Sequence, residues 1–99
     1  MLTSKQRAYL RGLASTQEDV AIVGKDGLND ACLESIEKVL NARELIKIKV
    51  LPNCDSSARE IADKLQEKLK ADVVGVVGYK VMLYKYSSKK DIKHINIKL

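Results

Sequence analysis

The loop VGKDGLND, residues 23–30, places two glycines three positions apart between an apolar segment and the expected start of a helix. Glycine adopts positive φ angles easily and has no side chain, so the backbone of such a loop can approach a phosphate closely. Backbone N–H groups and the helix dipole then favour an anion, and a lysine in the loop adds a mobile cation. The pattern suggests phosphate binding by four candidate residues: Gly24, Lys25, Asp26 and Gly27.

A purely structural interpretation of this loop stays open. The chain holds a second GxxG match, GVVG at residues 75–78, in an apolar segment where glycine more often marks a bulge or a close backbone approach. A strand-to-helix turn would also need glycine for its backbone angles alone. In addition, the Asp26 carboxylate would repel a phosphate unless it points away. The four residues alone leave two hypotheses, an anion site and a simple turn.

The net charge of the 99-residue chain is +5, and the whole excess lies near its C-terminus. Residues 1–78 hold 12 basic and 12 acidic residues, whereas residues 79–99 hold six lysines and one aspartate. Concentrated cations attract polyanions such as nucleic acid, or an acidic lipid surface, although a lysine-rich segment can also serve solubility alone. We expect a single domain over residues 1–99, in which residues 87–99 form a basic C-terminal tail.

Other cations are grouped by the periodicity of the segments that carry them. Arg7 and Arg11 lie four apart, as on one side of a helix, with Lys5 nearby. Lys47 and Lys49 lie two apart in an alternating segment and therefore point to the same side of a strand. These five residues are further candidate phosphate contacts.

Capping signals and apolar periodicity predict three helices that would position these groups. The signals for the helix starts are Thr3 with Gln6, Asn29, and Ser57 with Glu60. The second and third helices should end near residues 42 and 70. The expected buried stripe of the first helix consists of Gln6, Tyr9, Leu10, Leu13 and Ala14. The expected buried stripe of the second helix consists of Cys32, Ile36, Val39 and Leu40.

Four segments rich in apolar and β-branched residues predict strands, at residues 19–23, 44–51, 72–78 and 80–86. The element order is then αβαβαββ, an α/β (α+β) fold with three helices and four strands. Strands that alternate with helices favour largely parallel pairing, and the short link before the last strand favours one antiparallel partner. In residues 44–51, strict alternation puts Ile46, Ile48 and Val50 on one face.

Catalytic and metal chemistry find little support. The chain has neither a P-loop nor a GxGxxG pattern, and its single histidine, His94, lies in the tail. Cys32 falls on an expected core stripe, and the spacing of Asp30, Glu34 and Glu37 is typical of a solvated helix face. We therefore expect no enzyme, no cofactor, no metal site and no small-molecule substrate.

No targeting or membrane segment is evident either. The start of the chain lacks the long apolar segment of a signal peptide, and no apolar run approaches the roughly 20 residues that span a bilayer. Cys32 and Cys54 have neither a disulfide framework nor a zinc-ligand spacing. We expect a cytoplasmic monomer that does not bind membranes.

The aromatic residues restrict how a nucleic acid could be read. With no Phe, no Trp and four Tyr, the chain cannot present the aromatic sheet of an RRM domain. Tyr84 and Tyr86 share one face of the last expected strand and either stack on bases or pack beneath the third helix, with packing favoured for Tyr84. Tyr9, on the expected core stripe, is expected to be structural.

Four segments in a fixed order resemble YhbY-type proteins, which are stand-alone CRM domains: LTSKQRAYLRGLA, VGKDGLND, RELIKIKVL and VVGYKVMLYK. The resemblance covers nearly the full chain and implies a fold similar to the C-terminal domain of translation initiation factor three, with three helices on a four-stranded mixed sheet. It also implies RNA binding through a KH-like GxxG loop, which residues 24–27 would form. Lys85 stands where arginine is common in the family, so the charge is kept but a bidentate fork is lost.

The resemblance also implies a partner. Bacterial stand-alone members are associated with precursors of the large ribosomal subunit, which makes ribosomal RNA the expected ligand and subunit assembly the expected role. An alternative is a protein-interaction module that docks on ribosomal proteins and uses its charge only for steering. A third class, an enzyme acting on a phosphate-containing substrate, lacks a convincing catalytic set.

Overall fold

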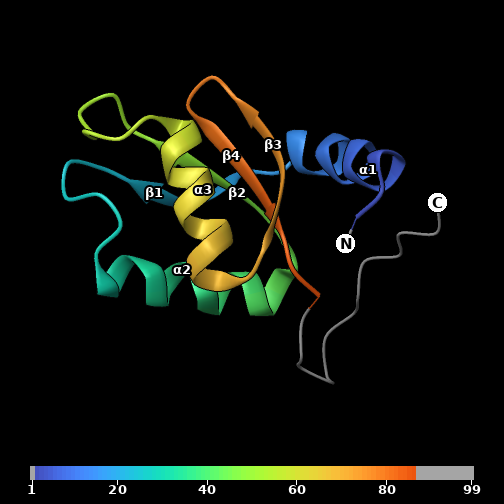
Figure 1. Cartoon of the computed structure of the whole chain (residues 1–99), viewed down its shortest axis with the longest axis horizontal. Helices are drawn as coiled ribbons and strands as arrows, with labels where there is room; N and C mark the ends of the chain where they lie inside the picture. Colours follow the sequence, from blue (N-terminus) through green and yellow to red (C-terminus); the bar gives the residue numbers. More distant parts are fainter. Residues whose placement is uncertain (1, 87–99) are drawn as a thin grey trace.

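Three helices and four strands make up the computed structural model, which describes residues 2–86 (Figure 1). The predicted tail at residues 87–99, with His94, lies outside the described residues. The observed order confirms the expected αβαβαββ arrangement. The elements are α1 (Ser4–Ser15), β1 (Asp19–Val23), α2 (Asp30–Arg43), β2 (Leu45–Val50), α3 (Ala58–Leu69), β3 (Asp72–Val77) and β4 (Lys80–Tyr84).

Side-chain caps fix all three helix starts at the residues that the sequence indicates. The Thr3 hydroxyl accepts from the Gln6 N–H at 3.1 Å, and the Thr3 N–H donates to the Gln6 side chain at 2.9 Å. Ser57 and Glu60 form the same reciprocal box at α3. At α2 the side chain of Asn29 accepts from the Cys32 N–H at 2.8 Å. Each cap satisfies backbone donors that the first helical turn would otherwise leave unpaired.

The four strands form one mixed sheet in the order β1-β2-β4-β3. The strands β1 and β2 pair in parallel, whereas β4 lies between β2 and β3 and is antiparallel to both. The expectation of largely parallel pairing is therefore wrong, although β4 is the only antiparallel strand among the four. A short hairpin joins β3 to β4, and β4 also pairs with β2. Strand β3 therefore lies at the edge of the sheet and does not pair with β2, to which it is parallel.

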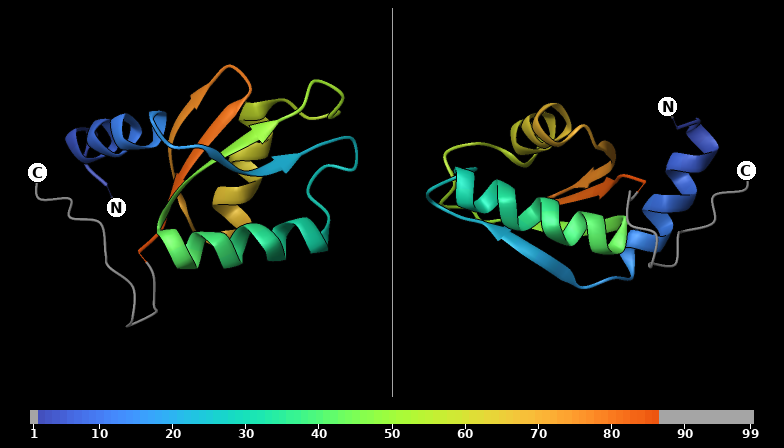
Figure 2. Two further views of the ribbon diagram at one scale, coloured as in Figure 1. Left: turned by 180° about the vertical axis from the view of Figure 1, so that it is seen from behind. Right: turned by 90° about the horizontal axis from the view of Figure 1, so that it is seen from below.

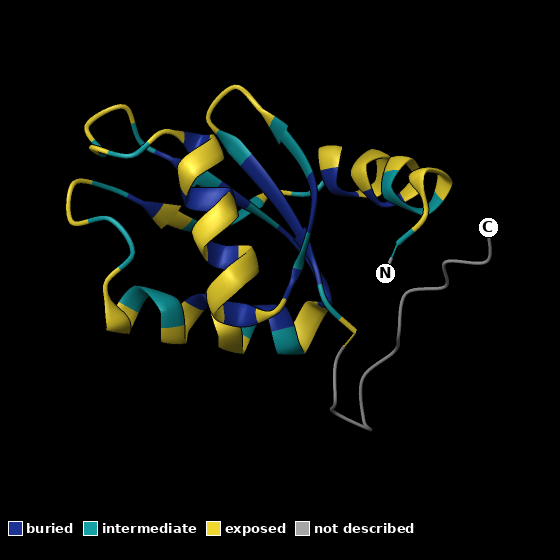
Figure 3. Ribbon diagram, in the orientation of Figure 1, coloured by how far each residue is buried: buried dark blue, intermediate teal, exposed yellow. Residues whose placement is uncertain are grey.

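The alternation in β2 separates two hydrophobic clusters on opposite faces of the sheet. Ile46, Ile48 and Val50 pack with α2 and α3 in the larger cluster. Leu45 points to the other face and joins the smaller cluster with Leu10 of α1. Helices α2 and α3 therefore cover one face, and α1 covers part of the other. Figure 3 shows the central strands buried between these layers.

The predicted buried stripe of α1 is too wide. Leu10 and Ala14 are buried, but Tyr9 is 42% exposed and Leu13 is 37% exposed. Helix α1 rests on the sheet alone, and Figure 1 shows it set apart from α2 and α3, so only a narrow line of its surface is covered. The structural role expected for Tyr9 is thus not supported by burial. In α2, Ile36 and Leu40 are buried as predicted, while Cys32 and Val39 are only half-buried.

The last two tyrosines differ in burial. Tyr84 is 4% exposed, which confirms the packing role, but it packs beneath α1 rather than beneath α3. Burial, with the nearby Glu44 carboxylate, raises the pKa of the Tyr84 hydroxyl above its ordinary value. Tyr86 is 64% exposed. Because Tyr84 is buried, its ring cannot stack on a base in this arrangement.

The second GxxG match has the predicted structural explanation. A register shift between Val73 and Gly75 marks a bulge in β3, and Gly78, with φ of 57°, forms the hairpin turn. A Cβ atom on Gly75 would lie 2.9 Å from Cδ of Arg11. Gly75 therefore lets the Arg11 side chain lie directly across the sheet.

The two leucines of α1 provide a test of this packing. We expect Leu10→Ala to lower the free energy of unfolding by roughly 2–5 kcal/mol, because it leaves a cavity in the smaller cluster. Leu13→Ala should lower it by no more than about 1 kcal/mol, because that side chain is partly exposed and belongs to neither hydrophobic cluster. Urea unfolding followed by circular dichroism measures both values. Equal losses would contradict the observed orientation of α1.

Candidate nucleic-acid interface

The loop at residues 24–27 is a hydrogen-bonded turn. The Gly27 N–H donates to the Gly24 carbonyl at 2.9 Å, and Gly27 has φ of 64°. Only Gly27 needs glycine for its backbone angle, because Gly24 does not adopt a positive φ. The turn itself therefore requires a glycine at position 27. The turn still leaves Lys25 and Asp26 exposed at its tip.

A shallow groove of about 270 Å³ separates this turn from the loop before α3. Figures 1 and 2 show the two loops side by side at one end of the molecule. Lys25 and Gly27 line one side of the groove, and Ser56 and Lys64 line the other. The groove therefore has a cation on each side, and α3 supplies the second one.

Two carboxylates, Asp26 and Asp55, line the same groove and offset its positive charge. Neither forms an ion pair with Lys25 or Lys64, because the ion pairs within residues 2–86 lie elsewhere. The start of α2 is also already served by its Asn29 cap and by Asp30 in the first turn. A phosphate would thus be held by the lysine ammonium groups and the turn, with little help from the helix dipole.

The predicted sheet lysines do point to one face, the face that carries α1, but they differ in their partners. The Lys47 ammonium donates to the Ser15 carbonyl at 3.2 Å and so stabilises the C-terminal end of α1. Lys49 lies farther along β2, is half-buried, and forms no ion pair within residues 2–86. Of these two lysines, Lys49 is therefore the one whose ammonium group is more available to bind a ligand.

The basic side chains of α1 also differ, because one bonds to the sheet and the others are exposed to solvent. The Arg7 guanidinium donates to the Val73 carbonyl at 3.0 Å, next to the bulge in β3. Arg11 crosses Gly75 and is exposed, and Lys5 is exposed near the start of the helix. Arg7 uses one of its five N–H donors in this bond, so its charge still contributes to the local field.

Lys85 lies apart from the turn. Its ammonium donates to the Leu69 carbonyl at 2.9 Å, at the C-terminal end of α3, whereas the turn at residues 24–27 lies near the N-terminal end of that helix. A cation in this position stabilises the helix terminus. Lys85 therefore contacts the end of α3 and does not lie near Lys25.

Two further cations near these surfaces, Lys64 and Lys80, are not indicated by the sequence motifs. Lys64 of α3 lies in the same groove as Lys25, and this proximity depends on how the loop before α3 packs near the turn at residues 24–27. Lys80 lies directly opposite Lys49 in the β2–β4 ladder. Its side could have been deduced, because alternation in residues 80–86 places Lys80 on the same face as Met82 and Tyr84.

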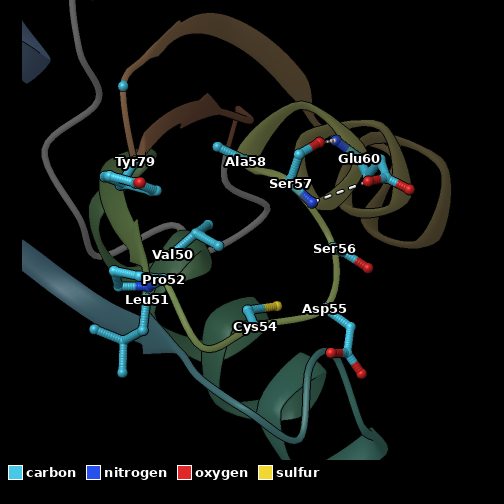
Figure 4. Close-up of a pocket in the computed structure, with 11 residues that line it drawn as sticks. Val50, Leu51, Pro52, Cys54, Asp55, Ser56, Ser57, Ala58, Glu60 and Tyr79 are labelled. Carbon is cyan, nitrogen blue, oxygen red and sulfur yellow. Dashed lines mark hydrogen bonds between the residues drawn. The ribbon is translucent and has the colours of Figure 1, made fainter.

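A second cavity, of about 400 Å³, lies on the other side of the loop before α3. Figure 4 shows Tyr79 across this cavity from Ser57 and Glu60, with Pro52 on the same side as Tyr79. The backbone hydrogen bond from Ser57 lowers the pKa of the Glu60 carboxyl. Because that carboxylate serves the α3 cap, its role here is structural.

Neither metal nor membrane features accompany these surfaces in the described part of the chain. No group of three His, Cys, Asp or Glu side chains among residues 2–86 comes together to hold a metal ion. Nor does any helix within those residues have the length and apolar character needed to cross a membrane. Burial raises the pKa of the Cys32 thiol, which disfavours its thiolate form.

Comparisons with known proteins agree with the fold and identify the family. The family model for the CRS1 / YhbY (CRM) domain matches residues 2–85. A Bacillus subtilis protein named "Probable RNA-binding protein YqeI" is 38% identical over 89 residues, which cover 90% of this chain and 93% of the relative. A Haemophilus influenzae protein named "RNA-binding protein" is 34% identical over 92 residues, which cover 93% of each.

A solved structure supports the same assignment. The solution structure of SAV1595 from Staphylococcus aureus matches with a TM-score of 0.78 and 36% sequence identity, covering 92% of this chain and 95% of that one. Sequence and architecture thus agree over almost all of the described residues. The chain belongs to the CRS1/YhbY (CRM) domain family.

Proposed function

We propose that this protein binds RNA and that its GKDG turn contacts the RNA backbone. The observation that carries the proposal is the exposed Lys25, which lies at the tip of a tight turn without an ion-pair partner in residues 2–86. Its position in a CRM domain whose relatives are named RNA-binding proteins supports RNA as the polyanion. Lys64, across the groove, provides a second cation for the same strand.

The geometry favours recognition of backbone and shape. Cationic side chains position a nucleic acid without reading its sequence. The one buried tyrosine of the sheet, Tyr84, cannot stack on a base. We propose binding rather than catalysis, with affinity that depends steeply on salt because phosphate contacts release counterions.

We propose further that the ligand is ribosomal RNA in a precursor of the large ribosomal subunit and that the protein assists assembly of this subunit. The resemblance to YhbY-type proteins supports this choice of particle. Docking on ribosomal proteins is the alternative, and it predicts that reversing a loop charge leaves binding to the particle unchanged.

Reversal of the loop charge tests the contact. Lys25→Asp should weaken binding to a large-subunit ribosomal RNA fragment severalfold and flatten the slope of log affinity against log salt by about 0.7–0.9, the share of one phosphate contact. Titration at several salt concentrations measures both quantities, and circular dichroism checks the fold.

The control is Lys38→Glu, which makes the same change in net charge on the exposed face of α2, where Lys38 pairs with Glu34 at 3.4 Å. This variant should keep the wild-type slope. Equal effects of the two substitutions would mean that total charge, and not the turn, determines affinity.

Lys85 defines the extent of the site. We expect Lys85→Met to lower the free energy of unfolding by roughly 0.3–1 kcal/mol, because the C-terminal carbonyls of α3 lose a cation. The salt slope of RNA binding should stay at the wild-type value, since the ammonium is already bonded to Leu69. A flatter slope in the same titration would show that Lys85 contacts phosphate.

A further inference from the structure

We propose that the half of the sheet face that α1 leaves open is a second RNA contact surface, on which a row of four side chains holds a stretch of sugar–phosphate backbone. The row consists of Ile22, Lys49, Lys80 and Val77, one from each strand. This inference rests on the proposed function, because it assigns a further part of the same RNA to a surface outside the GKDG turn.

The register of the sheet places these residues side by side. Ile22 pairs with Lys49 in the parallel ladder, and Lys49 pairs with Lys80 in the first antiparallel ladder. Lys80 in turn pairs with Val77. Directly paired residues point to the same face. Because Met82 of β4 lies beneath α1, Lys80 two residues earlier lies on that same face, beyond the helix.

The two central residues of the row are both lysines, although strand pairs ordinarily avoid like charges opposite each other. Like charges directly opposite each other, as in Lys49 and Lys80, destabilise a strand pair. The fold partly offsets this cost with an ion pair that reaches across β2, between Lys80 and Asp19. Lys49 has no carboxylate partner within residues 2–86. An anion bound over both lysines would remove the remaining repulsion.

The ends of the row are apolar and solvated. Ile22 is 60% exposed and Val77 is 57% exposed, and within residues 2–86 they are the only exposed residues of the four strands. They flank the two lysines on either side, so apolar contacts lie next to charged ones. This arrangement, with two cations at the centre and an apolar residue at each end, suits a strand of RNA, in which ribose faces flank the phosphates.

Charge and continuity favour RNA over a protein on this surface. Lys47 lies in the next pair of the same face along β2, and the exposed Arg11 crosses Gly75 in the adjoining pair of β3 and β4. Two further cations therefore border the row, and Asp19 is the acid that pairs with one of its lysines. Ile22 also precedes the GKDG turn by only one residue, Val23. A single polyanion can therefore pass from the turn onto the sheet.

Two substitutions of opposite sign test the surface. Lys49→Glu should weaken binding to the ribosomal RNA fragment severalfold and flatten the salt slope by about 0.7–0.9. Asp19→Asn removes the carboxylate that competes for Lys80, so it should strengthen binding and leave the slope equal or steeper. Circular dichroism and thermal unfolding confirm that both variants fold.

The apolar ends need a separate variant. Ile22→Thr keeps a β-branched residue on the exposed edge strand, so the sheet should persist. It should weaken RNA binding about two- to threefold while the salt slope stays constant, because no phosphate contact is lost. Unchanged affinity would overturn the role of the apolar ends.

The outcomes separate this inference from the proposed function. Lys38→Glu again serves as the charge-matched control on α2. If Lys25→Asp weakens binding while Lys49→Glu behaves like the control and Asp19→Asn leaves the affinity unchanged, RNA binding stands and the second surface is refuted. If the wild-type protein shows no salt-dependent affinity for the RNA, both proposals fail. Binding to ribosomal proteins that Lys49→Glu disrupts, with RNA affinity intact, would also overturn the inference.

Discussion

The insertion of β4 between β2 and β3 is the constraint on which the other features depend. The central strand pairs with both neighbours and is covered on each side, by α3 through Val81 and Leu83 and by α1 through Met82 and Tyr84. This position aligns Lys80 with Lys49 and brings the β3–β4 hairpin beside the end of β2, where the Val50 N–H donates to the Tyr79 carbonyl at 2.7 Å. A sheet with β3 beside β2 would separate these groups.

Part of the positive charge of the domain helps to hold the fold together. Arg7, Lys47 and Lys85 each donate to a backbone carbonyl, at the bulge of β3, the end of α1 and the end of α3 respectively. Such carbonyls would otherwise depend on water. A count of basic residues therefore overstates the number available for a ligand, and the geometry of each cation decides its role.

The sequence predicts the elements well and their assembly less well. Capping boxes and strict alternation are local signals, so the helix starts and the two faces of β2 follow from a few residues each. The place of β4 in the sheet is a long-range choice that alternation does not encode, and it also decides that Tyr84 packs under α1. Similarly, Lys25 is visible in the motif, but Lys64 joins it only because two distant loops meet.

The narrow attachment of α1 has a consequence for motion in the domain. Leu10 and Ala14 are its only buried residues among those described, whereas α3 buries five. Local opening of α1 would expose less apolar surface than opening of α3, and regions with few buried contacts open at the lowest free energy. Amide hydrogens of α1 should therefore exchange with solvent ahead of those in the central strands. The helix that bounds the open half of the sheet thus needs less free energy to open locally than α3 does.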